Sequence, residues 1–449
     1  MRAGERSAVV TLPRAYVPTP LEISTERLPG PLMTLGLIVV LPLFAQSFYY
    51  LNELTVSYLL SKAWPILTAP LALYALISLR LPGKIFYLLF LAYALGMTPL
   101  ISMVHLGNGV FDGVLTTVKV WPLTYYFGLS ALLVLLSPSY ERTKTVLIGL
   151  GVTTFVLMVV LWVLVPTSWY GNNPELGKLF MVEDERGYRI YMPMFFGALL
   201  LFFLTRSFMQ RPRLLPLLAI VAGFVLMIMI FKQRTSIGAM FLVCVYGAAM
   251  SLQPRPRLAV LALLAVIAPL GLVFLVVFNA QDLTQSLGGS LTVRQTSVEL
   301  AANFLGDNPW RWLFGVGATT RFGTVTLADI FGNSQFYVAD LGWFGVVFEY
   351  GLFGAVLLAG LYAWGLFVVL RRVRTTNDPL LLALSDYIVF MLVTSAVYSL
   401  VFTPGELGVV MALAIHLSQA RERVPAAEWP PHRIVSSRPD ARPTTFSRT

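Results

Sequence analysis

Residues 213–231 read RLLPLLAIVAGFVLMIMIF and residues 235–252 read TSIGAMFLVCVYGAAMSL, with only the polar KQR of 232–234 between them. Each apolar run is long enough, at the rise of an α-helix, to cross a bilayer. Three residues leave room only for a tight turn. The sequence therefore predicts two neighbouring transmembrane helices joined at one face of the membrane.

Apolar runs of this length recur along the whole chain of 449 residues. Hydrophobic residues make up 57% of the sequence and charged residues only 12%, whereas a soluble domain carries about 25% charged residues. The sequence predicts an all-α polytopic membrane protein with about twelve transmembrane helices and a large ordered periplasmic loop. We expect the spans near residues 31–50, 56–79, 84–104, 112–136, 144–165, 189–206, 213–231, 235–252, 257–279, 341–370, 380–402 and 406–420.

The chain divides into five consecutive parts. We expect residues 1–30 to form a cytoplasmic tail and 31–279 to form the first nine transmembrane helices. Residues 280–340 are the large periplasmic loop, and 341–420 are the last three helices. The remaining part, 421–449, is rich in Pro, Arg and Ser and is predicted to be a disordered cytoplasmic tail.

Two internal patterns refine this division. Apolar residues at helical spacing over 291–305 predict a helix inside the large loop. The stretch 335–370 is too long for one straight crossing, so we expect Gly351 and Gly354 to break it into a half-helix and a full span. A long ordered loop in a membrane protein often carries the function.

Basic residues mark alternate connections between the spans and thereby predict the orientation. Because loops rich in Lys and Arg stay in the cytoplasm, both termini are predicted to be cytoplasmic, in an inner membrane. The formal charge of +10 is therefore an orientation signal rather than a sign of nucleic-acid binding. The residues concerned are Arg80, Lys84, Arg142, Lys144, Arg206, Arg211, Arg213, Arg255, Arg257, Arg371, Arg372, Arg374, Arg421 and Arg423.

The sequence shows no motif of a soluble enzyme and no metal site. Its single cysteine, Cys244, excludes a disulfide framework, and its three histidines are far apart, so a zinc site is not expected. The pair Gly315 and Gly317 lacks the strand and helix of a dinucleotide site.

Positive charges on the predicted outer side are not explained by orientation. Guanidinium groups offer forked donors that match phosphate oxygens, so a pyrophosphate is a candidate ligand. The alternative is that long cationic side chains at helix ends reach back to the interface. We favour this alternative for Lys232. The full set is Arg186, Arg189, Lys232, Arg234, Arg294, Arg311 and Arg321.

Charged residues inside the predicted spans form a second group, comprising Lys62, Lys119, Asp340, Glu349 and Asp386. Charges at membrane depth are costly and usually face a cavity or a partner. Lys119 lies in the middle of a span, where its side chain cannot easily reach the interface, so a role in a cavity is expected. Lys62 and Asp386 are a candidate structural pair, which the sequence does not decide.

Three local motifs occur in order along these spans. The first is QRTSIG at Gln233–Gly238, in the outer turn; the second is Arg294 followed by NPWRWLFGVG at Asn308–Gly317; the third is EYGLFG at Glu349–Gly354. Together with the topology, which covers most of the chain, they resemble the O-antigen ligase and O-antigen polymerase (Wzy-type) family. Each motif alone has low specificity.

One position departs from the family pattern. The family usually has a histidine eleven residues before the glycine that is Gly351 here, and this chain has Asp340. Two readings are open. Asp340 replaces the histidine as the base or acceptor-orienting group, or the base lies elsewhere and Asp340 pairs with an outer arginine.

The resemblance implies a polysaccharide polymerase that joins undecaprenyl-pyrophosphate-linked oligosaccharide repeats at the periplasmic face. The transfer would be metal-independent and inverting and would need no cofactor. Arg234 and Arg294 would stabilise the departing pyrophosphate, and Asp340 would act on the acceptor hydroxyl. A chain-length regulator and a flippase are candidate protein partners beside the lipid bilayer, and nucleic acid is not expected. Further candidates for substrate binding are Arg189, Arg321, Lys119 and Glu349.

Other functions remain open from the sequence. A ligase that moves finished polymer to a lipid or protein acceptor belongs to the same family and shares its motifs. A transporter or flippase for a lipid-linked or anionic solute would carry charges along a path at mid-membrane depth, where Lys62, Lys119 and Asp386 are compatible with it. A non-catalytic scaffold would not need the outer arginines.

Overall fold

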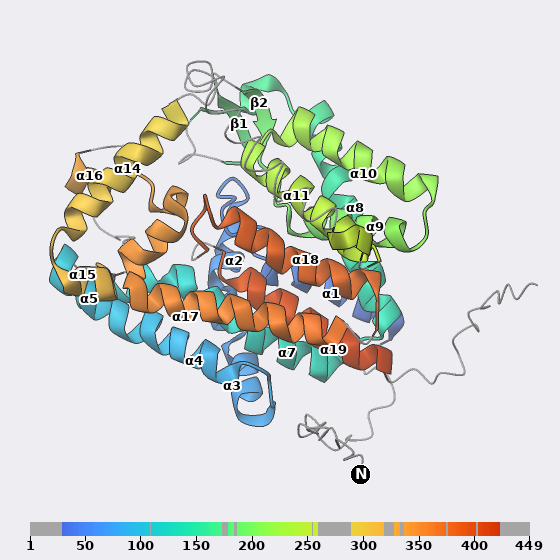
Figure 1. Ribbon diagram of the computed structural model, residues 1–449, viewed down its shortest axis with the longest axis horizontal. Coiled ribbons are helices and arrows are strands. Elements are labelled where there is room, and N and C mark those ends of the chain that lie inside the picture. Colours follow the sequence, from blue (N-terminus) through green and yellow to red (C-terminus); the bar gives the residue numbers. More distant parts are fainter. Residues whose placement is uncertain are drawn as a thin grey trace, which may run out of the picture.

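The computed structural model describes residues 29–107, 109–172, 178–183, 186–253, 255–258, 289–317, 327–332, 336–373, 376–400 and 403–422 (Figure 1). The elements of the first half are α1 (Gly30–Phe44), α2 (Thr55–Leu67), α3 (Ala69–Ser78), α4 (Lys84–Ala92), the π-helical η1 (Tyr93–Met97), α5 (Thr98–Leu106), α6 (Val110–Leu115), the 3₁₀ segment η2 (Thr116–Thr124), α7 (Tyr125–Leu136), α8 (Tyr140–Leu164), the 3₁₀ turn η3 (Thr167–Trp169) and the antiparallel hairpin β1 (Phe180–Glu183) and β2 (Gly187–Ile190).

The second half continues with helices that pack on the first. Its elements are α9 (Phe195–Gln210), α10 (Leu214–Leu226), the π-helical η4 (Met227–Phe231), α11 (Arg234–Ser251), α14 (Gly289–Leu305), α15 (Pro309–Phe314), α16 (Leu327–Phe331), the 3₁₀ turn η5 (Val338–Leu341), α17 (Gly342–Val373), α18 (Pro379–Thr394) and α19 (Gly405–Glu422). In Figure 1, α14, α15 and α16 lie together beside the beginning of α17, and α8 to α11 form the opposite side of the molecule.

Among the described residues, seven helical segments are long and apolar enough to cross a membrane, so the chain is an all-α, multi-pass membrane protein. Seven of the predicted spans agree with these segments to within a few residues. The count of twelve stays a prediction, and nearly all of the predicted span 257–279 lies outside the described residues. The segments are Thr55–Ser78, Lys84–Leu106, Val110–Leu136, Tyr140–Leu164, Leu214–Phe231, Arg234–Ser251 and Val338–Val373.

Three predicted spans are shorter or displaced in the structure. The span predicted at 31–50 is helical only to Phe44. The span predicted at 189–206 begins at Phe195, because the residues before it pair with β1 as strand β2. The span predicted at 380–402 ends at Thr394, where the chain turns to pack on the beginning of α17. Apolar content alone does not distinguish the non-helical ends of these three predicted spans from helix.

α17 is broken at Gly351, as predicted. This glycine has φ 64° and ψ 179°, a conformation open essentially to glycine alone, whereas Gly354 does not interrupt the helix. The two carbonyl groups before the break receive hydrogen bonds from outside the helix: Val316 N donates to Phe348 O at 2.9 Å and Gly317 N to Glu349 O at 3.0 Å. The segment after α15 thus supplies hydrogen-bond donors to the carbonyl groups at the break. Backbone polar groups in a lipid environment need such partners within the protein.

The predicted helix at 291–305 is confirmed as α14. Ser297, Ala301 and Leu305 are buried, whereas Val298 is exposed. Ala301 and Leu305 belong to a small hydrophobic core of their own, with Phe348 and apolar residues of η5 and α16. The described parts of 280–340 therefore pack mainly around this second core, while Phe314 of α15 packs against the main core.

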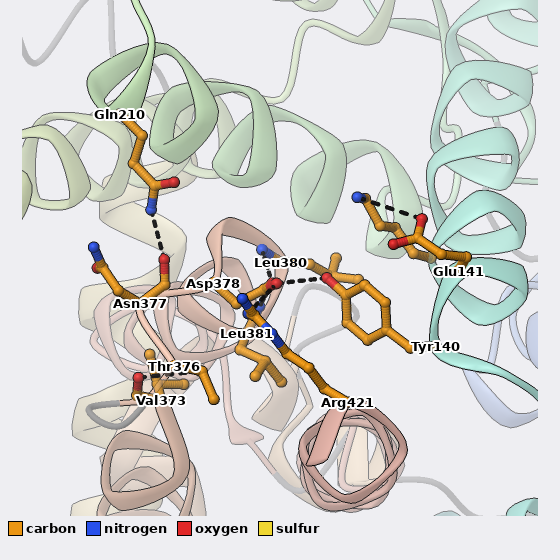
Figure 2. A network of polar contacts seen from close by, with 11 residues as sticks. Tyr140, Glu141, Gln210, Val373, Thr376, Asn377, Asp378, Leu380, Leu381 and Arg421 are labelled. Atoms are coloured by element: carbon orange, nitrogen blue, oxygen red, sulfur yellow. Dashed lines mark hydrogen bonds and ion pairs between the residues drawn. The ribbon is translucent and has the colours of Figure 1, made fainter. Parts of the chain in front are cut away.

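One end of the bundle, which we call the Asp378 end, is held by a polar network (Figure 2). The Asp378 carboxylate accepts hydrogen bonds from the Tyr140 hydroxyl at 2.6 Å and from Arg421 Nη1 at 2.6 Å. Its other oxygen caps α18 by accepting from the backbone N–H groups of Leu380 and Leu381. The network ties α8, α18 and α19 together, so several of the predicted basic connections converge at this end.

Candidate functional site

The opposite end, which we call the Asp340 end, lies where α17 begins. The part of α17 after the break at Gly351 runs toward the Asp378 end over on the order of 30 Å. The predicted outer residues Arg189, Arg234, Arg294 and Asp340 all lie on elements of this end. Their placement decides which of them form one site.

Arg294 reaches the bundle because it lies on the buried face of α14. Residues 294, 297, 301 and 305 follow one another at intervals of three and four, which places them on one face of a helix. The burial of Ser297, Ala301 and Leu305 directs this face inward, and Arg294 with it. The Arg294 guanidinium carbon lies 5.9 Å from the centroid of the Tyr398 ring.

Asp340 and Tyr398 are brought together by the early end of α18. After Thr394 the chain leaves the helix, and Ser399 N donates a hydrogen bond of 2.8 Å to Ala339 O, next to Asp340. Gly342 permits this approach, because at φ 55° a Cβ there would lie 2.6 Å from Ala396 O. The charges of Arg294 and Lys178 both act on the Asp340 carboxyl.

Arg189 lies on strand β2 of the hairpin and is buried, with 7% of its surface exposed. Its guanidinium pairs with Glu183 across the hairpin, and Nη2 is 3.4 Å from the sulfur of Met181. Burial lowers the pKa of Arg189, and the Glu183 carboxylate opposes that shift. Tyr398, whose ring lies near Arg294, also acts electrostatically on Arg189.

Lys178 and Tyr398 belong to the site, although sequence reasoning did not select them. Burial lowers the pKa of the Lys178 ammonium, and the carboxylates of Asp340 and Glu53 oppose that shift. Leu179 N also donates to Glu53 Oε1 at 2.5 Å, which fixes the segment beside Lys178. Lys178 is a cation on the predicted outer side, which is a signal that the sequence contains. Nothing in the sequence marks Tyr398.

We refer to Lys178, Arg189, Arg294, Asp340 and Tyr398 as the Arg294 cluster. The Nε atoms of Arg189 and Arg294 are buried, and among the described residues neither has a hydrogen-bond acceptor. Arg294 also has no carboxylate at salt-bridge distance in the described part of the chain. A buried guanidinium without an acceptor is costly. The cluster is therefore suited to an anion that supplies the missing acceptors.

Arg234 lies in a different hollow, a pocket of about 320 Å³. Its other lining residues are Arg186, Ile228, Lys232 and Ile237. Lys232 Nζ donates to Arg186 O at 2.9 Å, which joins the hairpin to the turn before α11. Neither Arg294 nor Asp340 lines this pocket. Gln233, next to Arg234, reaches the Arg294 cluster by a hydrogen bond of 3.3 Å to the Tyr398 hydroxyl, and Arg186 of the pocket shares the Glu183 carboxylate with Arg189.

Lys119 and Glu349, both predicted to bind substrate, form an ion pair with each other. Glu349 is fully buried and Lys119 is 7% exposed. The pair connects η2 with the turn of α17 that precedes the break at Gly351. Lys119 and Glu349 are therefore structural partners of each other. Their contact with substrate stays a prediction.

The second and third sequence motifs meet at this break. Gly315 and Gly317 have φ of 77° and 87°, and a Cβ on Gly315 would lie 2.5 Å from Glu349 O. A Cβ on Gly351 would lie 2.3 Å from Leu313 O. The Tyr93 hydroxyl lies 2.9 Å from Phe314 O and 2.8 Å from Tyr350 O. These glycines therefore serve close backbone packing.

The remaining charged candidates have the following positions. Arg321 lies outside the described residues. Arg311 Nη1 donates to Phe304 O at 2.7 Å, which ties α15 to α14. The suggested pair of Lys62 and Asp386 is wrong: Asp386 binds Arg206 through two hydrogen bonds of 2.7 and 2.6 Å, and Lys62 lies 3.5 Å from the Tyr49 ring centroid.

Comparison with known proteins gives no relative to set beside this geometry: no family model matches the chain, and no curated protein matches it.

Proposed function

We propose that this chain is a polysaccharide polymerase of a bacterial inner membrane, acting on undecaprenyl-pyrophosphate-linked oligosaccharides at the Asp340 end. In this proposal the Asp340 end faces the periplasm, and the basic Asp378 end faces the cytoplasm with both tails. The observation that carries the proposal is the Arg294 cluster. Within it, the buried Nε atoms of Arg189 and Arg294 have no acceptor among the described residues, and the Arg294 charge acts on the Asp340 carboxyl.

The cluster offers the two groups that the reaction needs. The acceptor hydroxyl oxygen attacks the anomeric carbon of the donor, and the bond from that carbon to the pyrophosphate oxygen breaks. The hydroxyl proton passes to the Asp340 carboxylate, and the polyprenyl pyrophosphate leaves with the electron pair. Arg294, Arg189 and Lys178 would stabilise the negative charge on the leaving group, where low polarity strengthens their effect.

The proposal assigns supporting roles to the other candidate residues. Arg234, with Arg186 and Lys232, would hold a phosphate beside the apolar wall of Ile228 and Ile237. Ile228 is 58% exposed, so this pocket is continuous with the surface available to a polyprenyl chain. Lys119 and Glu349 would support the site by holding the broken helix rather than by touching the reacting atoms.

The first test is binding. Native mass spectrometry of the purified chain should show retention of undecaprenyl pyrophosphate and not of undecaprenol. Arg294→Ala should weaken this binding by about tenfold or more, because it removes a charged hydrogen-bond donor. The matched control is Arg211→Ala, which removes an exposed arginine at the Asp378 end. Equal retention of the two lipids by the unaltered chain would overturn the assignment of the cluster.

The second test separates a transferase from a transporter. Asp340→Asn should keep binding but lower the rate of polymer formation from lipid-linked repeats by about 100-fold or more, as expected for loss of a general base. A transporter would bind the same lipid and form no new glycosidic bond. A ligase would form a single bond to another lipid or protein acceptor, so the length distribution of the product distinguishes it from a polymerase.

A further inference from the structure

A second basic pocket lies at the Asp378 end, far from the Arg294 cluster. It has a volume of about 340 Å³ and forms between the turn after α3 and the last turn of α17. The seven described residues that line it include three cations and no acid. They are Ile77, Leu79, Arg80, Leu81, Pro82, Lys84 and Arg372.

The pocket is built by specific contacts rather than by mobile surface chains. Gly83 has φ 74°, and a Cβ there would lie 2.5 Å from the Trp364 indole, so glycine lets α17 pack on the turn. This packing also places Arg372, in the last turn of α17, in the wall of the pocket. The Tyr126 hydroxyl donates to Pro82 O at 2.6 Å, and Lys84 Nζ donates to Leu76 O at the end of α3.

The walls of the pocket differ in chemistry. Arg80, Lys84 and Arg372 form its polar side, whereas Ile77 on its apolar side is 77% exposed. Next to it the rings of Phe86 and Trp364 lie 5.6 Å apart, and aromatic side chains are typical of the membrane interface. A soluble anion would need only the cations. A pocket that joins cations to exposed apolar surface fits a phosphate that carries acyl chains.

We propose that this pocket binds one anionic phospholipid of the phosphatidylglycerol type. Arg80, Lys84 and Arg372 receive its phosphate, and an acyl chain lies along Ile77 and Leu79. Basic pockets between transmembrane helices on the cytoplasmic side commonly hold such head groups. The proposal does not depend on glycosyl transfer, because it rests on residues at the opposite end of α17.

The test compares lipids on the purified chain. Delipidated protein in detergent is given phosphatidylglycerol or phosphatidylcholine of the same acyl length, and bound lipid is counted by native mass spectrometry. The unaltered chain should prefer phosphatidylglycerol. Arg80→Gln combined with Arg372→Gln should reduce this preference by roughly tenfold to thirtyfold, at about fivefold for each cation. This double variant retains Lys84, so the contact with Leu76 is kept.

Two controls decide the outcome. Arg211→Gln combined with Arg213→Gln removes the same charge from exposed positions at the same end and should leave the preference unchanged. An equal loss in this control, or none in the Arg80/Arg372 variant, would overturn the proposal. Displacement of the lipid by millimolar inorganic phosphate would do so too, since it would show a site for free phosphate. If the double variant fails to fold, Ile77→Glu at an exposed position should repel the lipid phosphate instead.

Discussion

The two ends of this bundle differ in how completely their charges are paired: at the Asp340 end Arg189 is paired with Glu183, whereas Arg294 has no carboxylate at salt-bridge distance among the described residues. At the Asp378 end, the carboxylate of Asp378 is fully engaged by Tyr140, Arg421 and two backbone N–H groups. Deeper on the same side, Arg206 and Asp386 form a pair with two hydrogen bonds. At the Asp340 end, Arg294 faces Asp340 and Tyr398 without an acceptor for its buried Nε in the described chain.

This difference separates charges that hold the fold from charges kept for a ligand. A closed pair gains its stability from its own partner, and removing one member leaves the other buried and uncompensated. An open guanidinium contributes little to folding, because its desolvation is not offset until an anion arrives. Substitutions at the two ends should therefore change different measurements.

The largest effect is expected at the closed pair. Arg206→Ala leaves the Asp386 carboxylate buried between α9, α11 and α18, and should lower the free energy of unfolding by about 3–5 kcal/mol. Thermal unfolding in detergent, followed by circular dichroism, measures this loss. Arg211→Ala, exposed just beyond the end of α9, should have almost no effect. Similar midpoints for both variants would remove the structural role of the pair.

The second effect should appear in function and not in folding. Arg294→Ala should reduce glycosyl transfer by about 100- to 1000-fold, which corresponds to roughly 3–4 kcal/mol of transition-state stabilisation. The same variant should not lower the unfolding free energy, because it breaks no ion pair among the described residues and removes a buried Nε that lacks an acceptor. A loss of stability as large as that of Arg206→Ala would end the distinction between the two ends.

The third effect concerns the break in α17 at Gly351, where the segment after α15 packs on the helix. Gly351→Ala forces a Cβ against Leu313 O at φ 64° and should cost about 2–3 kcal/mol in unfolding free energy. Gly360→Ala is the control in the same helix, since a Cβ there meets no atom within 4 Å. It should be neutral or slightly stabilising. Equal stabilities would show that the break can relax.

The smallest effect is expected for one bond of the Asp378 network. Tyr140→Phe removes a hydrogen bond of 2.6 Å, but Arg421 still pairs with the same oxygen of Asp378. The unfolding free energy should fall by about 1 kcal/mol. Tyr74→Phe, at a tyrosine that is 39% exposed, should leave it unchanged. A loss above that of Gly351→Ala would mean that the network acts as one unit.

The membrane character of the chain, most of its long helices and the break at Gly351 could be predicted from the amino-acid sequence. Apolar runs of bilayer length and a glycine inside an overlong run are local signals. The sequence also picked out Asp340 as a charge at the edge of a predicted span, and Arg294 as a cation on the predicted outer side within one of the three local motifs.

By contrast, the tertiary structure was needed to show which charges face one another. Lys119 meets Glu349 across 230 residues, and Arg206 meets Asp386 across 180, distances over which spacing carries no information. It also separated Arg234 from Arg294, and it brought Tyr398 and Lys178 to Asp340. These pairings depend on helix packing, in which a rotation of one helix by a single residue would turn each charge toward a different neighbour.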